Sequence, residues 1–171
     1  MGKRLDRAFY NRDVLDVAPQ LLGKHLVRIG ENGLKSSYVI TETEAYRGIE
    51  DMACHASKGR TPRTEVMFGE GGHLYMYLIY GMYWMMNVVT GVKEVPQAVL
   101  FRGLKEASGP GRLTRLVGVD RDFYGEDLVR SGRIWIEESG ASPVYEAGPR
   151  VGIDYAGEPW KDLPWRFLIN L

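Results

Sequence analysis

The sequence predicts an α+β fold: a single compact domain with a mostly antiparallel, curved sheet, a protruding hairpin and flanking helices. Apolar residues recur in short runs of strand length, turn residues separate these runs, and two stretches have helical spacing instead. The 21 glycines and eight prolines are spread through the chain, which is typical of many short elements joined by tight turns. The 171 residues contain no repeat, low-complexity tract or linker, so we expect one domain over residues 1–171.

The amino-terminal part predicts a helix followed by two strands. Residues 13–23 have helical spacing, with Pro19 as a kink or part of the first turn and Gly23 as the stop. Residues 25–28 and 37–46 predict strands on either side of a glycine-containing turn. The residues expected to face inward from the helix are Val14, Val17 or Ala18, Leu21 and Leu22.

The middle of the chain predicts a hairpin. Two apolar and aromatic runs, residues 74–79 and 82–89, are separated by Tyr80 and Gly81. A glycine between two such runs is a hairpin signal, so we expect a tyrosine at or near its tip. Residues 98–101 predict another buried strand.

The carboxy-terminal part predicts a capped helix and short strands. Ser108 is expected to be the helix N-cap, with Pro110 in the first turn. Residues 133–137 and 166–169 predict the last strands.

Composition limits the class of protein. No apolar run approaches the roughly 20 residues that a membrane helix needs, and the basic start is not followed by an apolar signal stretch. Cys54 is the only cysteine, which excludes an internal disulfide and a CxxC zinc knuckle. We therefore expect a cytoplasmic or nucleoid-associated protein with no membrane partner.

The charges balance but are unevenly placed. The 22 basic and 22 acidic residues argue mildly against a nucleic-acid binder, which usually has a basic excess. Residues 102–115 nevertheless carry a local charge of +3 and residues 52–68 one of +2, against −4 for residues 122–146. One face can therefore be basic, although scattered solvated charge explains the composition equally well.

The run Thr41–Tyr46 carries two carboxylates in a strand pattern. With a period of two, Glu42, Glu44 and Tyr46 share one face with Ile40. Burying carboxylates among apolar neighbours is costly unless they are paired or a raised pKa serves catalysis. An exposed edge strand with solvated acids is the alternative.

Aromatic residues are dense between residues 73 and 84. Tyr75 and Tyr77 are explained by ordinary packing in a strand, but Tyr80 lies beside Gly81 in a turn and should protrude. A rigid aromatic side chain at the tip of a hairpin can intercalate between stacked bases and hold a duplex open.

The histidines do not predict a metal site. His25, His55 and His73 are widely spaced and form no HxxxH or HExxH pair. A hydrogen-bonding or stacking role for His55 on a loop is the better interpretation. A metal-dependent hydrolase built on His25, His55 and Glu44 is the alternative.

Several segments together resemble a known family. These are Glu42–Tyr46, Asp51 with His55, Arg60–Arg63, Met67–Phe68, His73–Met82, Asn87–Val89, Ala98–Arg102, Ser108–Leu113, Arg150–Ile153 and Pro164–Phe167. Their order and spacing resemble the alkyladenine (3-methyladenine) DNA glycosylase family, and the likeness covers nearly the whole chain. Members of that family flip an alkylated or deaminated purine into a pocket and hydrolyse its N-glycosidic bond.

The resemblance implies a role for each matching residue. Glu44 matches the catalytic glutamate, the general base for the attacking water. Tyr46 matches the aromatic residue on one face of the flipped base, and His55 and Tyr77 match the groups on the other face. Tyr80 matches the intercalating residue. Asn87, which completes the expected substrate-binding set, matches the residue that crowds the exocyclic amino group of normal guanine.

The resemblance also implies a partner and a surface for it. Arg102 matches a pocket-adjacent arginine that faces the DNA backbone. The expected partner is double-stranded DNA with damaged purines, bound by a monomer that needs neither a metal nor an organic cofactor. The residues expected to bind DNA are Tyr80, Arg102, Arg63, Ser108, Gly109 and Arg112.

Some positions depart from the family pattern. Ile49 and Thr64 replace a frequent proline and asparagine, residues 70–71 replace a turn that often contains proline, and residues 102–108 are a shortened segment. The shortened segment affects what can be expected of the strength of DNA binding and of the range of substrates. A non-catalytic module that binds damaged or single-stranded DNA on a tyrosine platform is the alternative function.

Overall fold

The computed structural model describes residues 2–171 and has nine strands in one sheet, in which every described strand pair is antiparallel. The strands are β1 (His25–Ile29), β2 (Lys35–Tyr46), β3 (Leu74–Ile79), β4 (Tyr83–Thr90), β5 (Gln97–Leu104), β6 (Ala107–Ser108), β7 (Ile134–Glu137), β8 (Glu146–Gly148) and β9 (Arg166–Leu168). The α-helices are α1 (Arg7–Tyr10), α2 (Val14–Gln20) and α3 (Pro110–Val117). The 3-10 helices are η1 (His55–Lys58), η2 (Glu65–Phe68), η3 (Arg121–Phe123), η4 (Asp154–Ala156) and η5 (Trp160–Asp162). The predicted α+β class is confirmed.

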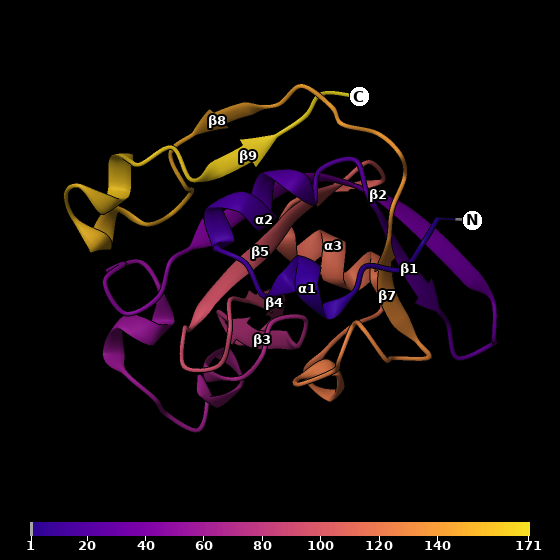
Figure 1. Ribbon diagram of the computed structural model, residues 1–171, viewed down its shortest axis with the longest axis horizontal. Helices are drawn as coiled ribbons and strands as arrows, with labels where there is room; N and C mark the ends of the chain where they lie inside the picture. Colours follow the sequence, from indigo (N-terminus) through magenta and orange to yellow (C-terminus); the bar gives the residue numbers. More distant parts are fainter. Residues whose placement is uncertain (1) are drawn as a thin grey trace.

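Strand β2 is the centre of the sheet. The main strand order is β3-β4-β5-β2-β1-β7, and β8 and β9 join at β2 (Figure 1). The first part of β2 pairs with β1, whereas residues 42–44 lie between β5 and β9. Glu44 is opposite Leu100 on one side and Arg166 on the other. The alternative of a solvated edge strand is therefore wrong for this acidic segment.

A bulge in β2 decides which side chains face the core. The pairing with β5 changes register between Ile40 and Glu42 and again between Glu42 and Thr43. Such a shift moves the following side chains to the other face of the sheet. Ile40 consequently joins Ala45 in the core, and the prediction that it shares a face with Glu44 is wrong. The hydroxyl of Thr43 donates to the carbonyl of Ala18, which ties β2 to α2.

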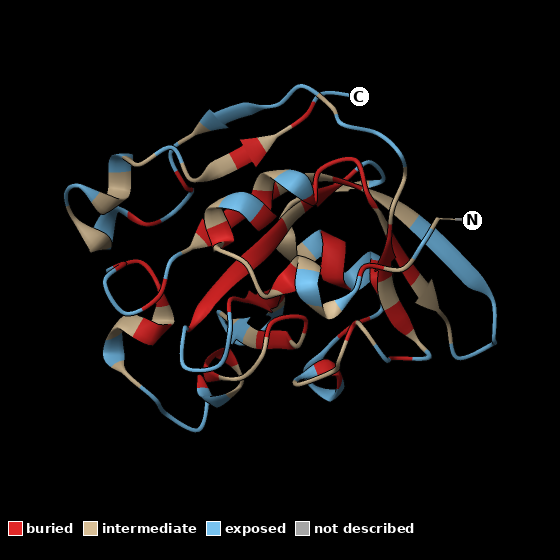
Figure 2. Cartoon of the chain, viewed as in Figure 1, coloured by how far each residue is buried: buried red, intermediate tan, exposed pale blue. Residues whose placement is uncertain are grey.

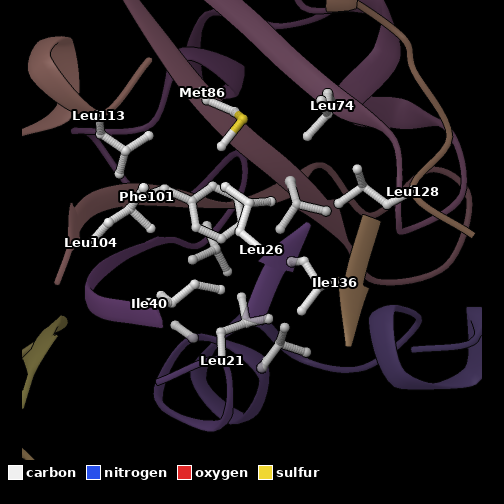
Figure 3. Packing of buried hydrophobic residues seen from close by; sticks show 14 of the residues in the cluster. Leu21, Leu26, Ile40, Leu74, Met86, Phe101, Leu104, Leu113, Leu128 and Ile136 are labelled. Atoms are coloured by element: carbon white, nitrogen blue, oxygen red, sulfur yellow. The ribbon is translucent and has the colours of Figure 1, made fainter. Parts of the chain in front are cut away.

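The hydrophobic core lies where α2 and α3 pack on the middle strands. Helix α2 packs on β2 and β5, and α3 packs on β4 and β5. Buried positions gather along β5 and the inner sides of both helices (Figure 2). Phe101 and Met86 lie among aliphatic side chains from both ends of the chain (Figure 3). The helix residues predicted to face inward, Val14, Val17, Ala18, Leu21 and Leu22, are all buried.

The β3–β4 hairpin has the predicted tyrosine at its tip. Tyr80 and Gly81 have φ values of 51° and 65°, and the N–H of Met82 donates to the carbonyl of Ile79. Positive φ at two successive turn residues matches the right-handed twist of the flanking strands. The side chain of Tyr80 is 86% exposed, so it protrudes from the molecule.

Two predicted helix boundaries are wrong. Helix α2 ends at Gln20 with Pro19 in its last turn, and Gly23 follows it with a φ of 82°. Helix α3 has Gly109 rather than Ser108 as its N-cap. Ser108 pairs with Gly103 as part of β6, so a strand ladder holds it outside the helix.

Replacing Phe101 by alanine tests the core. Its side chain is 0% exposed, and removing a fully buried ring costs about 3–5 kcal/mol of stability. Urea unfolding of the Phe101→Ala variant should show this loss, whereas Tyr80→Ala should change stability by less than about 0.5 kcal/mol. An equal loss in the two variants would contradict this account of the core.

Candidate active site

A cleft of about 700 Å³ is lined by the β3–β4 hairpin, the loop around residues 52–64 and the segment 151–155. A small chamber of about 40 Å³ adjoins it, with Asn87 in its lining. Tyr46, His55 and Tyr77 line both cavities. The fold therefore brings the residues predicted to bind a base to one place.

Glu44 is buried behind the wall of this cleft. Its side chain is 0% exposed, and its carboxylate accepts hydrogen bonds from the Tyr46 hydroxyl at 2.8 Å and the Val151 N–H at 2.7 Å. The Nε of Arg102 lies 3.9 Å from Oε2. These three partners all line the cleft, so the carboxylate lies directly behind them and is not itself part of the cleft lining.

Burial raises the pKa of Glu44 above its usual value. The charge of Arg102 and the hydrogen bonds from Val151 and Tyr46 act in the opposite direction. A carboxylate in this setting is a stronger proton acceptor than a solvated one, and its donors hold it in a fixed orientation. It can therefore take a proton from a group bound in the cleft.

Glu42 is paired rather than solvated. Its Oε1 lies 3.3 Å from the Nε of Arg102 and 3.1 Å from a terminal nitrogen of Arg166. Arg102 thus lies against both carboxylates, and its guanidinium faces the site more than the solvent. Arg102 lines the cleft, and its expected contact with the DNA backbone stays a prediction.

The aromatic wall of the cleft is neutral. The rings of His55 and Tyr77 have centroids 4.5 Å apart. Burial raises the pKa of the Tyr46 and Tyr77 hydroxyls, so both remain protonated. Burial, assisted by the positive charges of Arg63 and Lys58, lowers the pKa of His55 to about 4.

Asn87 is fixed at the inner chamber. It is buried on β4 directly opposite Tyr75, and its amide nitrogen donates to the Tyr75 carbonyl at 3.1 Å. This bond sets the orientation of the side chain. The amide is thus rigid, as a group that discriminates among bases needs to be.

A buried ion pair behind the cleft was not predicted as part of the site. The side chains of Asp51 and Arg150 are both 0% exposed and make two hydrogen bonds of 2.6 and 3.0 Å. Arg150 also donates to the Ala45 carbonyl, and its guanidinium lies 4.9 Å from the Tyr46 ring centroid. Because Val151 is the next residue, the pair anchors the backbone N–H that binds Glu44. Asp51 and the segment Arg150–Ile153 were both among the positions that resemble the family, and this was the available signal.

The residues predicted to contact DNA separate into two groups. Tyr80, Arg63 and Arg102 line the cleft. Ser108 ends β6, Gly109 is the N-cap of α3 and Arg112 lies in the first turn of that helix, whose Pro110 lines the same cleft. The N–H of Gly109 already donates to the Arg102 carbonyl, so this group is not a free donor for a phosphate.

The three histidines lie apart. His25 on β1 lines a different cavity with Lys35 and Glu137, and His73 lies 3.8 Å from Asp127. The structure therefore does not assemble the alternative site of His25, His55 and Glu44. Among residues 2–171, no three His, Cys, Asp or Glu side chains form a group that could hold a metal ion.

Replacing Arg150 by methionine tests the buried pair. The substitution leaves the Asp51 carboxylate buried without its partner, which should cost about 3–5 kcal/mol of stability. Lys161→Met is the matched control, because the Lys161–Glu158 pair is largely exposed and should matter by less than about 1 kcal/mol. Urea unfolding measures both, and a small loss in Arg150→Met would show that the pair is dispensable.

Comparison with known proteins agrees with this site. A family model described as methylpurine-DNA glycosylase (MPG) matches residues 8–107 and 105–171. A protein of Desulfitobacterium hafniense (strain Y51) is 45% identical over 98% of this chain and 96% of its own length. One from Methanocella arvoryzae is 44% identical over 95% of this chain and 90% of its own, and one from Legionella pneumophila (strain Lens) is 44% identical over 98% and 95%. All three carry the name "Putative 3-methyladenine DNA glycosylase".

No helix in residues 2–171 is long and apolar enough to cross a membrane.

The family match and the relatives confirm the resemblance noted in the sequence. The chain belongs to the methylpurine-DNA glycosylase family and is a DNA glycosylase, a hydrolase of DNA repair.

Proposed function

We propose that this protein is a monofunctional glycosylase that excises alkylated or deaminated purines after flipping them out of duplex DNA. The observation that carries the proposal is the Glu44 carboxylate, buried directly behind an aromatic cleft and hydrogen-bonded to Tyr46 and Val151, which line that cleft. The base would occupy the cleft between Tyr46 and the pair His55 and Tyr77. We place this reaction in the cytoplasm, on damaged chromosomal DNA.

The neutral aromatic wall suits a base that carries positive charge. A 3-methylated adenine is cationic, and each cation–π contact with a tyrosine is worth about 0.5–2 kcal/mol. The raised pKa of the Tyr46 and Tyr77 hydroxyls keeps the rings uncharged at neutral pH. An uncharged normal base gains less from the same rings, which favours damaged bases.

Glu44 would activate the attacking water. In the proposed step the water oxygen bonds to C1′ of the sugar, the N-glycosidic bond breaks, and the water proton moves to the Glu44 carboxylate. A cationic base leaves as a neutral molecule, so the charges balance. Proton removal by a positioned carboxylate contributes about 10²–10⁴ in rate, and the same charge stabilises oxocarbenium character in the sugar.

Water rather than an amine is the proposed nucleophile. Glu44 is the carboxylate held by fixed donors behind the cleft wall, whereas Lys58 lies on the exposed part of that wall. Hydrolysis by water leaves an abasic site and an intact strand. We therefore propose no lyase step.

Glu44→Gln tests the catalytic role directly. The amide cannot accept the water proton, so excision from alkylated duplex DNA should fall by about 10²–10⁴-fold while binding to the damaged duplex persists. Released bases are identified by chromatography, and binding is measured by fluorescence anisotropy. Undiminished excision would overturn the proposal, and so would wild-type protein that binds damaged DNA without releasing a base.

The same residue predicts the acid side of the pH profile. Because burial raises the Glu44 pKa, the carboxylate becomes protonated at a higher pH than an exposed glutamate would. Excision of a cationic base should therefore decline earlier on acidification than the ordinary glutamate pKa of 4.5 implies. Any residual excision activity of the Glu44→Gln variant should not show this decline at acidic pH, because the variant has no carboxylate at position 44 to protonate.

Tyr80→Ala tests the wedge. An exposed ring at the hairpin tip can fill the gap that a flipped nucleotide leaves in the base stack. The substitution should reduce excision from duplex DNA about tenfold more than excision from single-stranded DNA, because opening the stack costs a few kcal/mol only in the duplex. Leu34→Ala, at a distant exposed turn, is the control. Equal losses on the two substrates would contradict the wedge role.

A further inference from the structure

Arg63 makes contacts that a simple DNA-backbone contact does not require. Its Nε lies 3.2 Å from the Tyr75 hydroxyl oxygen, and its Nη2 lies 3.1 Å from the Nδ1 of His55. The guanidinium carbon is 5.3 Å from the Tyr77 ring centroid. Arg63 therefore lies against two rings of the cleft wall, His55 and Tyr77, and against Tyr75, which lines the inner chamber. Its own backbone carbonyl accepts a hydrogen bond from the Tyr124 hydroxyl, which holds this part of the loop.

The donors around His55 favour one tautomer of its ring. Arginine can only donate, so the Tyr75 oxygen accepts from Arg63 Nε and its own proton is free for the His55 Nδ1, 2.8 Å away. The Nη2 of Arg63 is a second donor, 3.1 Å from Nδ1 and 3.3 Å from Nε2. Because Nδ1 is the nearer of the two nitrogens and also faces the Tyr75 hydroxyl, this arrangement favours Nδ1 as the acceptor, with the ring proton on Nε2.

The groups around His55 also oppose its protonation. Both charges that shift its pKa, those of Arg63 and Lys58, are positive. Tyr75 and Tyr77 contact the ring from β3, and burial raises the pKa of Tyr75 to about 12. Burial likewise raises the pKa of the neighbouring Cys54 thiol to about 11, so neither group offers a negative charge at neutral pH.

We propose that Arg63 is a positioning residue of the base site, which through Tyr75 holds His55 as the neutral Nε2–H tautomer. This inference rests on the proposed function. A protonated imidazole in the cleft wall would repel a cationic purine, whereas a neutral ring accepts it. The positive charge of Arg63 thus opposes protonation of His55, which would put a second positive charge in the pocket. We therefore expect excision of positively charged lesions, in particular, to depend on Arg63.

The first experiment examines the protein without DNA. Long-range ¹H–¹⁵N correlation spectra of histidine-labelled protein report which ring nitrogen of His55 carries the proton. The wild type should show an unprotonated Nδ1 and a protonated Nε2 at pH 7, with no titration of His55 between pH 5 and pH 8. In Arg63→Gln the His55 pKa should rise, because one positive charge is removed.

Tyr75→Phe and Arg60→Gln complete the series. Tyr75→Phe removes the bridging hydroxyl but keeps the ring, so Nδ1 should lose its preference as the acceptor. Arg60 lies on the same loop but pairs with Glu94, so Arg60→Gln removes the same charge without touching His55. It should leave the His55 spectrum unchanged.

The second experiment compares two lesions. For a cationic base such as 7-methylguanine, the rate of Arg63→Gln relative to wild type should fall by about fivefold or more between pH 7.5 and pH 5.5. For neutral hypoxanthine that ratio should stay constant. A wild-type His55 protonated on Nδ1, or an unchanged titration in Arg63→Gln, overturns the inference. Absence of excision by the wild type would instead reject the proposed function, since the spectra do not depend on turnover.

Discussion

The buried ion pair of Asp51 and Arg150 is the contact on which the rest of the site depends. Arg150 binds the Ala45 carbonyl at the end of β2, and Asp51 accepts from the N–H groups of Arg47 and Ala53. Two loops and a central strand are thereby joined at one point. Two unscreened charges in a low-dielectric interior are stable only together, so the pair enforces one arrangement of these segments. Catalytic and binding groups on separate loops need such an anchor to keep a fixed geometry.

Charged and neutral side chains have distinct positions around this ion pair. The Glu44 carboxylate is buried behind the cleft wall, held by backbone and phenol donors, and the positive charge of Arg102 lies 3.9 Å from it. The rings of His55 and Tyr77 are neutral, and the Arg63 guanidinium lies 5.3 Å from the Tyr77 ring centroid. Because the chain has no net charge, its attraction for DNA has to come from the local distribution of charge rather than from a basic excess.

Local patterns predicted the elements well where one interaction dominates. The β3–β4 hairpin follows from two strand-like runs around Tyr80 and Gly81, and the core face of α2 follows from its helical spacing. Predictions were wrong where a non-local partner intervened. Pairing with Gly103 holds Ser108 in a strand, so Gly109 becomes the cap of α3. The bulge near Glu42 reversed the face of Ile40, because it depends on pairing with β5, a strand over fifty residues away.

The sequence by itself determined the fold class, the hairpin with its exposed tyrosine, the family and the order of the candidate residues, since each of these depends on local spacing or on motif order. The tertiary structure decided which groups meet. Whether Glu44 is solvated or buried depends on β9 and on the Val151 N–H, which lies 107 positions away. The contacts of Arg63 with Tyr75 and His55 likewise require the loop to fold onto β3. Burial and hydrogen-bond partners set the pKa of a side chain, and both are properties of the assembled chain rather than of any segment.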